Sequence, residues 1–306
     1  MKYLKPAVFK FMFRFLVSAV LLFFIFSFIE IDKAYKELIN VNIFYIILSV
    51  LFLIFPVYFK AARWMSIIRI FKTHIGMASV LYYTLISFAY AFITPGRVGE
   101  FVKVKFLADK TGIGYLKSFT TVVAEKIFDI LIMILLVFLG FSFLRGILPW
   151  SHYFIYLFIF YLLILALVFV YFDRVMLLAS SLLPKKYKES IRSFPITRLF
   201  YAKLMLFSLF FWITLSVQAF FILKSLGSSI PLFLMMGFVP LMAISSMLPI
   251  SIGGFGVREA VAIYFLSIAG ISVEKSAVFS LVYALITLGI PAIIGAILNI
   301  KKEAFF

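Results

Sequence analysis

Two glycine-rich segments of the sequence combine arginine with glutamate, and each follows a long apolar run. The charged members are Arg97 and Glu100 in the first segment and Arg258 and Glu259 in the second. An arginine guanidinium binds carboxylates and phosphates through two hydrogen bonds at once. Backbone N–H groups at the start of a broken helix also favour an anion. We predict that these four residues bind an anionic lipid head group, with the carboxylates neutralising the arginines when the site is empty.

A second pair of carboxylates, Glu125 and Asp129, lies inside the apolar run 118–144. Their i, i+4 spacing places both on one helix face, and a rise of about 1.5 Å per residue puts Asp129 near the middle of a bilayer. An ionisable group there costs roughly 2.5–3.5 kcal/mol on insertion scales, so it is usually functional or paired. We expect these carboxylates to face Arg97 and Arg258. A substrate site, a coupling-ion site and purely structural ion pairs all remain open.

Residues for familiar catalytic and metal sites are scarce. The chain has no cysteine, and its two histidines, His74 and His152, are far apart in sequence. This excludes thiol nucleophiles, cysteine ligands and a histidine-rich metal site. We find no P-loop, no Asp-x-Asp motif and no histidine near Ser251. We therefore expect no metal, no cofactor and no catalytic site. The alternative is an intramembrane lipid-modifying transferase that uses Glu125 and Asp129 as a metal-binding or general-base pair.

The composition predicts that these residues are held by membrane-embedded helices. Of the 306 residues, 65% are hydrophobic and 13% are charged, whereas soluble domains are about half apolar and a quarter charged. No soluble domain stands out, so residues 1–306 form one membrane-embedded unit. The net charge of +17 fits basic cytoplasmic loops and contact with anionic lipid rather than nucleic acid.

Apolar runs alternate with charged segments along the chain. The runs cover residues 9–29, 42–59, 77–94, 118–144, 152–172, 204–223, 230–248 and 276–300, with a short one at 260–269. We interpret Arg63 and Trp64 as an interfacial anchor in a basic loop, 60–74, and Lys103 and Lys105 as loop lysines that set topology.

Charge also predicts the orientation. Both termini and the segments 60–74 and 173–203 are basic, which places them in the cytoplasm. The lysines after 77–94 obey this rule only if that run turns back at the glycine-rich segment and returns through 101–108. Such a re-entrant hairpin is allowed where protein or a water-filled cavity satisfies the broken backbone. A second hairpin, 230–269, enters from outside. The prediction is an all-α polytopic protein of the cell membrane with six full transmembrane helices, two re-entrant hairpins and both termini cytoplasmic.

The two hairpins begin similar units, at about 77–144 and 230–300. Their turns share proline and glycine: Pro95, Gly96 and Gly99 in the first, and Pro249, Gly253, Gly254 and Gly256 in the second. In both units a Gly-Ile pair then stands five residues before a Lys-Ser pair that opens a long apolar helix. Since the units enter from opposite sides, they predict an inverted repeat. Repeats of this kind build transporters whose substrate site lies near the bilayer midplane, at broken helices.

These motifs resemble the flippase-like membrane region of the lysylphosphatidylglycerol synthase family. The resemblance extends from about residue 8 to 300 and is carried by TPGRVGE at 94–100, by Glu125, Lys126 and Asp129, and by PISIGGFGVRE at 249–259. In that family the position of Lys126 is usually arginine. In the full-length synthases a separate cytoplasmic domain makes the aminoacyl lipid. We expect this chain to be a stand-alone form without that domain, and therefore not a lysyltransferase.

The resemblance and the residues together predict a lipid flippase. Its cargo is expected to be an anionic, aminoacylated or polyprenyl-phosphate-linked lipid, and a lipid-synthesising enzyme is a possible partner. The absence of a nucleotide-binding motif argues against ATP as the direct driver. Besides the transferase, the alternative is a non-transporting partner subunit of a lipid or envelope biosynthesis enzyme.

Overall fold

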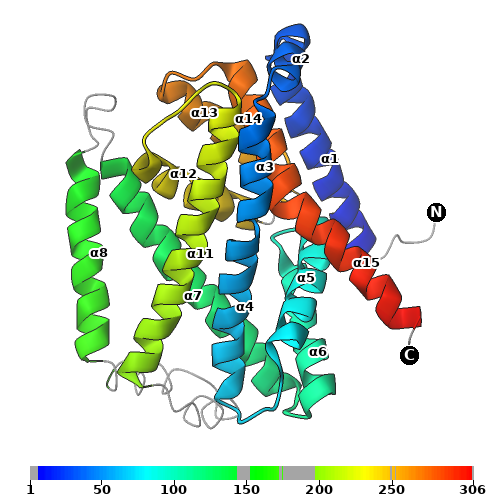
Figure 1. Ribbon diagram of the computed structural model, residues 1–306, viewed down its shortest axis with the longest axis vertical. Helices are drawn as coiled ribbons and strands as arrows, with labels where there is room; N and C mark the ends of the chain where they lie inside the picture. Colours follow the sequence, from blue (N-terminus) through cyan, green and yellow to red (C-terminus); the bar gives the residue numbers. More distant parts are fainter. Residues whose placement is uncertain are drawn as a thin grey trace.

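The structure, a computed structural model, describes residues 6–142, 152–171, 174, 197–248, 250–251 and 253–304 (Figure 1). Its elements are α1 (Pro6–Ser27), α2 (Ile31–Ile39), α3 (Ile43–Phe52), α4 (Ile54–Arg69), α5 (Met77–Ile93), the 3-10 turn η1 (Val98–Phe101), α6 (Val102–Thr111), α7 (Tyr115–Ser142), α8 (His152–Val170), α11 (Arg198–Ser225), α12 (Leu232–Met247), α13 (Val257–Ile268), α14 (Val273–Ala284), the π-helical turn η2 (Leu285–Gly289) and α15 (Ile290–Ala304). Pro249 and most of the basic segment 173–203 lie outside the described residues.

Membrane-spanning character is clear from the lengths and compositions of these helices. Four helical stretches among the described residues are long and apolar enough to cross a bilayer: Ile43–Arg69, Tyr153–Val170, Arg198–Ser225 and Val273–Ile300. Helix α7 has 28 residues, or about 42 Å at 1.5 Å per residue, although charges interrupt its apolar run. The chain is an all-α multi-pass membrane protein, which confirms the predicted fold class.

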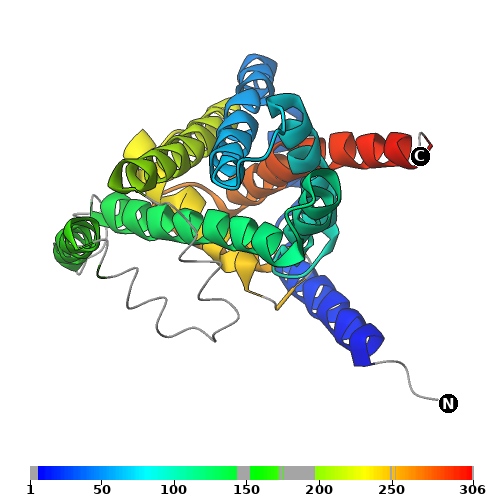
Figure 2. The ribbon, with the colours of Figure 1, turned by 90° about the horizontal axis from the view of Figure 1, so that it is seen from below.

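The outermost helices expose large apolar side chains, as expected of helices that face lipid. Helix α8 lies at one edge of the molecule, beside α7, and α1 extends from the opposite side (Figure 2). Large apolar side chains on both helices are exposed, such as Phe23 at 73% and Phe160 at 61%. Apolar surface on this scale is stable in hydrocarbon, where it has no contact with water to avoid.

The second apolar run extends much further than the sequence predicts. Helices α3 and α4 form one stretch, Ile43–Arg69, interrupted only at Leu53. The predicted basic loop at 60–74 is therefore wrong up to Arg69. Charged residues often mark the end of a membrane span, but Lys60 and Arg63 are buried inside the helix at 2% and 0% exposure. Likewise, residues 198–203 belong to α11 rather than to the predicted loop.

Two helical hairpins approach each other inside the molecule. Helices α5 and α6, joined by η1, occupy the lower half of Figure 1, whereas α12 and α13 pack together in its upper part. The turn regions of the two hairpins touch, because the rings of Phe92 and Phe255 lie 5.6 Å apart edge to face. A Cβ atom on Gly253 would lie only 2.6 Å from the Phe92 carbonyl oxygen.

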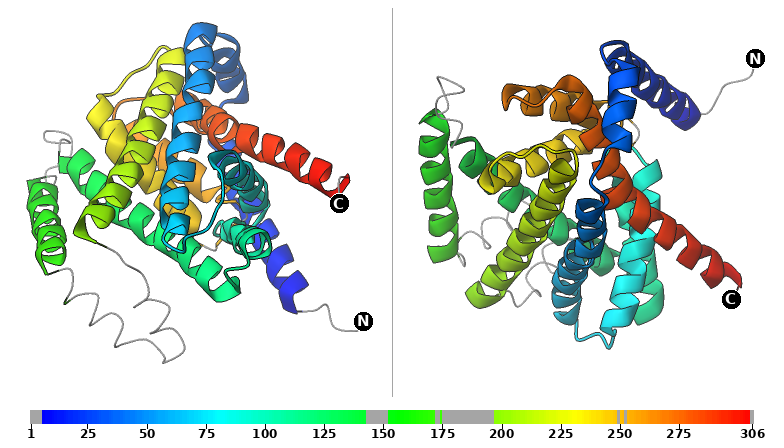
Figure 3. Two further views of the ribbon diagram at one scale, coloured as in Figure 1. Left: turned by 60° about the horizontal axis from the view of Figure 1, so that its bottom comes forward. Right: turned by 45° about the horizontal axis from the view of Figure 1, so that its top comes forward.

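The helices after each hairpin pack against the other hairpin. The most extensive contacts in the described part of the chain join α15 to α5 and α7 to α12, and α15 crosses α5 in Figure 3. Glycine allows close approach at both crossings. A Cβ atom on Gly140 would lie 2.5 Å from the Gly237 Cα, and one on Gly295 would lie 2.0 Å from the Leu85 carbonyl oxygen. Small residues permit such contact between membrane helices, where packing rather than water drives association.

Candidate functional site

Eight charged side chains meet inside the molecule, and we call them the ionic cluster. They are Lys60 and Arg63 of α4, Arg97 of the first hairpin turn, Glu100 of η1, Lys103 of α6, and Glu125, Lys126 and Asp129 of α7. Six of them are at most 3% exposed, whereas the Arg97 and Lys126 side chains are 15% and 19% exposed. Charges buried this deeply are stable only when they are paired and hydrogen-bonded.

Arg63 is the centre of one half of the ionic cluster. Its two terminal nitrogens donate to the two oxygens of Asp129 at 2.6 and 2.9 Å, the two-point geometry that favours arginine over lysine. Its Nη2 also lies 3.3 Å from Glu125 Oε1. The other oxygen of Glu125 accepts a 2.8 Å hydrogen bond from Lys103. Every carboxylate oxygen in this half therefore has a cationic partner.

Glu100 is the centre of the other half and is shared by three cations. Lys60 and Lys126 both donate to its Oε2, at 2.9 and 2.6 Å. Arg97 Nη2 lies 3.1 Å from its Oε1, but the two groups are not aligned for a hydrogen bond, and that buried oxygen has no hydrogen-bond donor among the described residues. This half is thus rich in cations and incompletely hydrogen-bonded.

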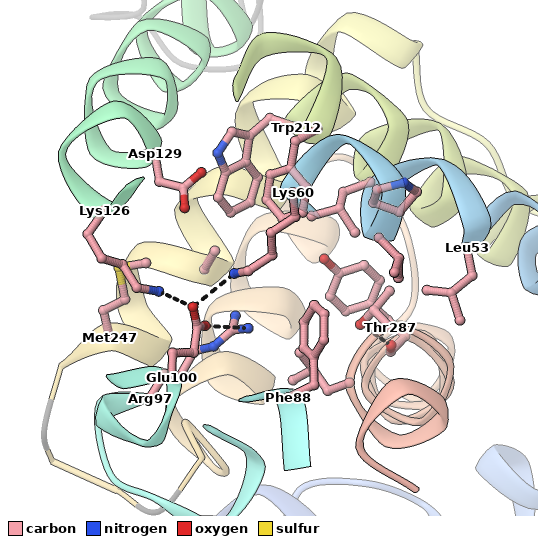
Figure 4. Close-up of a pocket in the computed structure, with 17 residues that line it drawn as sticks. Leu53, Lys60, Phe88, Arg97, Glu100, Lys126, Asp129, Trp212, Met247 and Thr287 are labelled. Carbon is pink, nitrogen blue, oxygen red and sulfur yellow. Dashed lines mark hydrogen bonds and ion pairs between the residues drawn. The ribbon is translucent and has the colours of Figure 1, made fainter. Parts of the chain in front are cut away.

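A cavity of about 40 Å³ opens beside Glu100 (Figure 4). At roughly 10–15 Å³ per water, it has room for about three water molecules. Its charged lining consists of Lys60, Arg97, Glu100, Lys126 and Asp129, and the rest of its wall is largely apolar, with Leu53, Phe88 and Met247.

Irregular backbone surrounds this cavity on several sides. Leu53, at the break between α3 and α4, is one wall residue, and Thr287, in the π-helical turn η2, is another. Arg97, in the first hairpin turn, has a φ of 57°, a left-handed conformation that is uncommon outside glycine. Backbone of this kind at membrane depth is tolerated where protein buries it or where it lines a cavity, and π-helical turns often mark functional sites.

Thr94 and Gly99 shape the turn that presents Arg97. The Thr94 hydroxyl donates to the Tyr90 carbonyl at 2.8 Å and accepts from the Gly99 N–H at 2.7 Å. The Gly99 backbone lies so close to α5 that an added Cβ would be 2.1 Å from the Tyr90 carbonyl oxygen. Gly96 also has a positive φ, 59°. The predicted turn residues Gly96 and Gly99 are thus needed by the backbone itself, and Pro95 precedes them in the same turn.

The second turn holds its charges in a separate pair. Glu259 accepts from the Gly256 N–H at 2.6 Å and pairs with Arg258 at 2.5 Å. The remaining guanidinium nitrogen of Arg258, Nη1, is buried without a hydrogen-bond partner among the described residues. Positive φ angles at the turn glycines let the chain reverse here: Gly253 at 60°, Gly254 at 80° and Gly256 at 86°.

The predicted site residues therefore separate into three groups. Arg97 meets Glu100, and Arg258 meets Glu259, as neighbouring charges. Glu125 and Asp129 do not pair with either arginine, so that part of the prediction is wrong. Arg63 and Lys103 are closer because α4 and α6 pack against the buried face of α7.

Sequence reasoning missed four cations of the ionic cluster: Lys60, Arg63, Lys103 and Lys126. The interfacial role predicted for Arg63 and Trp64 is wrong, since Trp64 is fully buried and donates to Thr121 at 3.1 Å. The sequence does contain a signal that Arg63 is buried in a longer helix, because the apolar residues Ile67 and Ile68 follow it. Charges inside a helix that stays apolar beyond them indicate buried pairs rather than an interface.

Comparison with known proteins identifies the family. The family described as the lysylphosphatidylglycerol synthase TM region matches residues 11–295. The chain belongs to this family. It is also similar to the UPF0104 membrane protein PH1989 of Pyrococcus horikoshii, with 26% identity over 89% of this chain and 91% of the relative. Membership confirms the resemblance read from the two glycine-rich motifs and is consistent with a lipid-related role in the membrane.

Proposed function

We propose that the protein is a lipid transporter that moves an anionic lipid between the leaflets of the cell membrane. The observation that carries this proposal is the cavity beside Glu100, where three cations share one carboxylate inside a membrane protein. A buried surplus of cations is costly unless an anion neutralises it. A lipid phosphate that enters the cavity would replace Glu100 as their partner.

The two halves of the ionic cluster then have different roles. In the Arg63 half each carboxylate oxygen has a cationic partner, and these bonds fix α4, α6 and α7 to one another; the buried atom without a partner there is Arg63 Nε. In the Glu100 half it is a carboxylate oxygen, Oε1, that lacks a hydrogen-bond donor among the described residues, and all four members of this half line the cavity. We assign head-group binding to Arg97, Lys60 and Lys126, with Glu100 as the counter-ion of the empty state. Arg258 and Glu259 hold the second hairpin turn, and the unpaired Nη1 of Arg258 is a further donor for an anion.

We further propose that α5–α6 and α12–α13 are re-entrant hairpins of an inverted repeat. Two contacts support two equivalent units. The helix that follows each hairpin packs on the other hairpin, since α15 packs on α5 and α7 packs on α12. The two turns also contact each other, through Phe92 and Phe255. Rocking of one unit against the other would expose the cavity to each leaflet in turn. Both termini are proposed to be cytoplasmic, and an enzyme that synthesises the lipid is the proposed partner.

Reconstitution tests this function. The purified chain is placed in liposomes that contain a fluorescent anionic, aminoacylated or polyprenyl-phosphate lipid, and loss of protection from a membrane-impermeant quencher is followed. We expect the wild type to move at least one of these lipids and both Arg97→Ala and Arg258→Ala to lose that activity while still inserting. Lys105→Gln, an exposed change on α6, is the matched control and should keep it. Normal transport by both arginine variants would contradict the site, and no transport by folded wild type would contradict the function.

A further inference from the structure

The charges around the cavity do not balance. Within the ionic cluster five cations face three carboxylates, which leaves an excess of two positive charges. The second turn does not change this excess, because Arg258 and Glu259 cancel each other. No further charged residue of the described parts of the chain lines the cavity.

The excess is located on the cavity side of the ionic cluster. Asp129 neutralises Arg63, and Glu125 neutralises Lys103. Glu100 is therefore left to three cations, Lys60, Arg97 and Lys126, all of which line the cavity. Since an uncompensated charge is strongly disfavoured in a low-dielectric interior, the best occupant brings two negative charges to this point.

Hydrogen-bond donors beside the cavity point to the same chemistry. Lys60, Lys126 and Arg97 supply the donors, whereas the two carboxylates of the lining, Glu100 and Asp129, supply only acceptors, and Asp129 is already bonded to Arg63. A terminal phosphate has three strong acceptor oxygens and carries close to two charges at neutral pH, because its second pKa is about 6. A phosphodiester has two such oxygens and a single charge.

We propose that the cavity selects a phosphate monoester, carried by a lipid, over a phosphodiester. This inference rests on the proposed function and narrows its cargo. The three terminal oxygens meet Lys60, Lys126 and Arg97. The ester side faces the apolar wall near Leu53. An aminoacylated phosphodiester fits poorly, because its amino group adds positive charge to a site that already has an excess.

Binding to matched lipids tests this preference separately from transport. Dioleoyl phosphatidic acid is a monoester, and dioleoyl phosphatidylmethanol is the diester with the same chains. Their binding to the purified full chain in neutral detergent at pH 8 is measured by native mass spectrometry. We expect phosphatidic acid to bind at least tenfold more tightly. Equal binding, or tighter binding of phosphatidylmethanol, would overturn the inference even if liposomes show transport. A preference for phosphatidic acid without any transport would support the inference and reject the proposed function.

Two test variants, one control variant and one competitor locate the effect. Lys126→Gln removes one excess charge from a partly exposed side chain, so the preference should fall to a few fold, whereas Lys105→Gln should keep it. Glu100→Gln removes the competing carboxylate and should tighten phosphatidic acid binding. An unchanged preference in Lys126→Gln would place the monoester elsewhere and overturn the assignment.

Glycerol 3-phosphate distinguishes the source of the phosphate. Weak competition supports a lipid cargo, and competition equal to that of phosphatidic acid overturns it.

Discussion

At the scale of single residues, the structure separates charges that hold the fold from charges that are available to a ligand. Arg63 is fully buried and has hydrogen bonds to two carboxylates. Arg97 is partly exposed, lines the cavity and has no aligned hydrogen bond to its carboxylate. The same residue type therefore predicts different effects of substitution at these two positions.

Arg63→Gln should destabilise the fold. The substitution leaves Asp129 and Glu125 buried without their main cation, and breaking a buried pair in this way costs about 3–5 kcal/mol. Unfolding of the purified protein in detergent measures the loss. Arg69→Gln, an exposed change on the same helix, should lie within about 0.5 kcal/mol of the wild type. Equal stability of the two variants would contradict a structural role for Arg63.

Arg97→Gly should leave the protein folded but inactive. Glycine adopts the left-handed φ of 57° more readily than arginine does, so the hairpin turn should form at least as easily. The guanidinium that faces the cavity is lost, and transport in liposomes should fall more than tenfold. Retained transport by this variant would show that Arg97 serves the backbone of the turn rather than the lipid.

At the scale of elements, the first hairpin depends on close contact between its turn and α5. Gly99→Ala forces a Cβ atom against the Tyr90 carbonyl oxygen, at 2.1 Å without movement. We expect a lower thermal transition than in the wild type and a loss of transport, because the turn must shift away from the cavity. Gly76→Ala is the control, since Gly76 has a negative φ of −79° and nothing within 4 Å of its added Cβ. Equal effects of the two substitutions would contradict this packing.

Elements were predicted better than the partners of their charges. Apolar runs located most helices, and proline with glycine located both turns, because these signals are local in sequence. The pairing of Asp129 with Arg63 depends on how α4 packs against α7. Local sequence patterns do not predict packing between helices that are distant in sequence. The burial of Lys60 and Lys103 was not predicted for the same reason. In the sequence their positive charges resemble topology signals, because their carboxylate partners, Glu100 and Glu125, are distant in sequence.

At the scale of the whole molecule, the proposed orientation makes a direct prediction for labelling. The chain has no native cysteine, so single cysteines report their own position. In intact cells, Lys36→Cys on α2 should react with a membrane-impermeant maleimide, and Lys110→Cys on α6 should react only after lysis. Both residues are exposed in the structure. Labelling of Lys110→Cys in intact cells would contradict the re-entrant path of α5–α6.

The two hairpins meet around one cavity, and transport by the proposed mechanism requires them to separate. The Phe92 and Phe255 rings, 5.6 Å apart, are the contact that must open. With Phe92→Cys and Phe255→Cys combined, a short bis-methanethiosulfonate reagent would join the turns through bonds that a reductant breaks again. Each single-cysteine variant, treated in the same way, controls for modification alone.

Lipid transport by this double variant is measured in liposomes before crosslinking, after it and after reduction. We expect movement of a fluorescent anionic lipid before treatment, a loss of movement after crosslinking and its return on reduction. Undiminished transport by the fully crosslinked protein would contradict transport by separation of the hairpins, as would the absence of transport from wild-type protein that is folded and inserted.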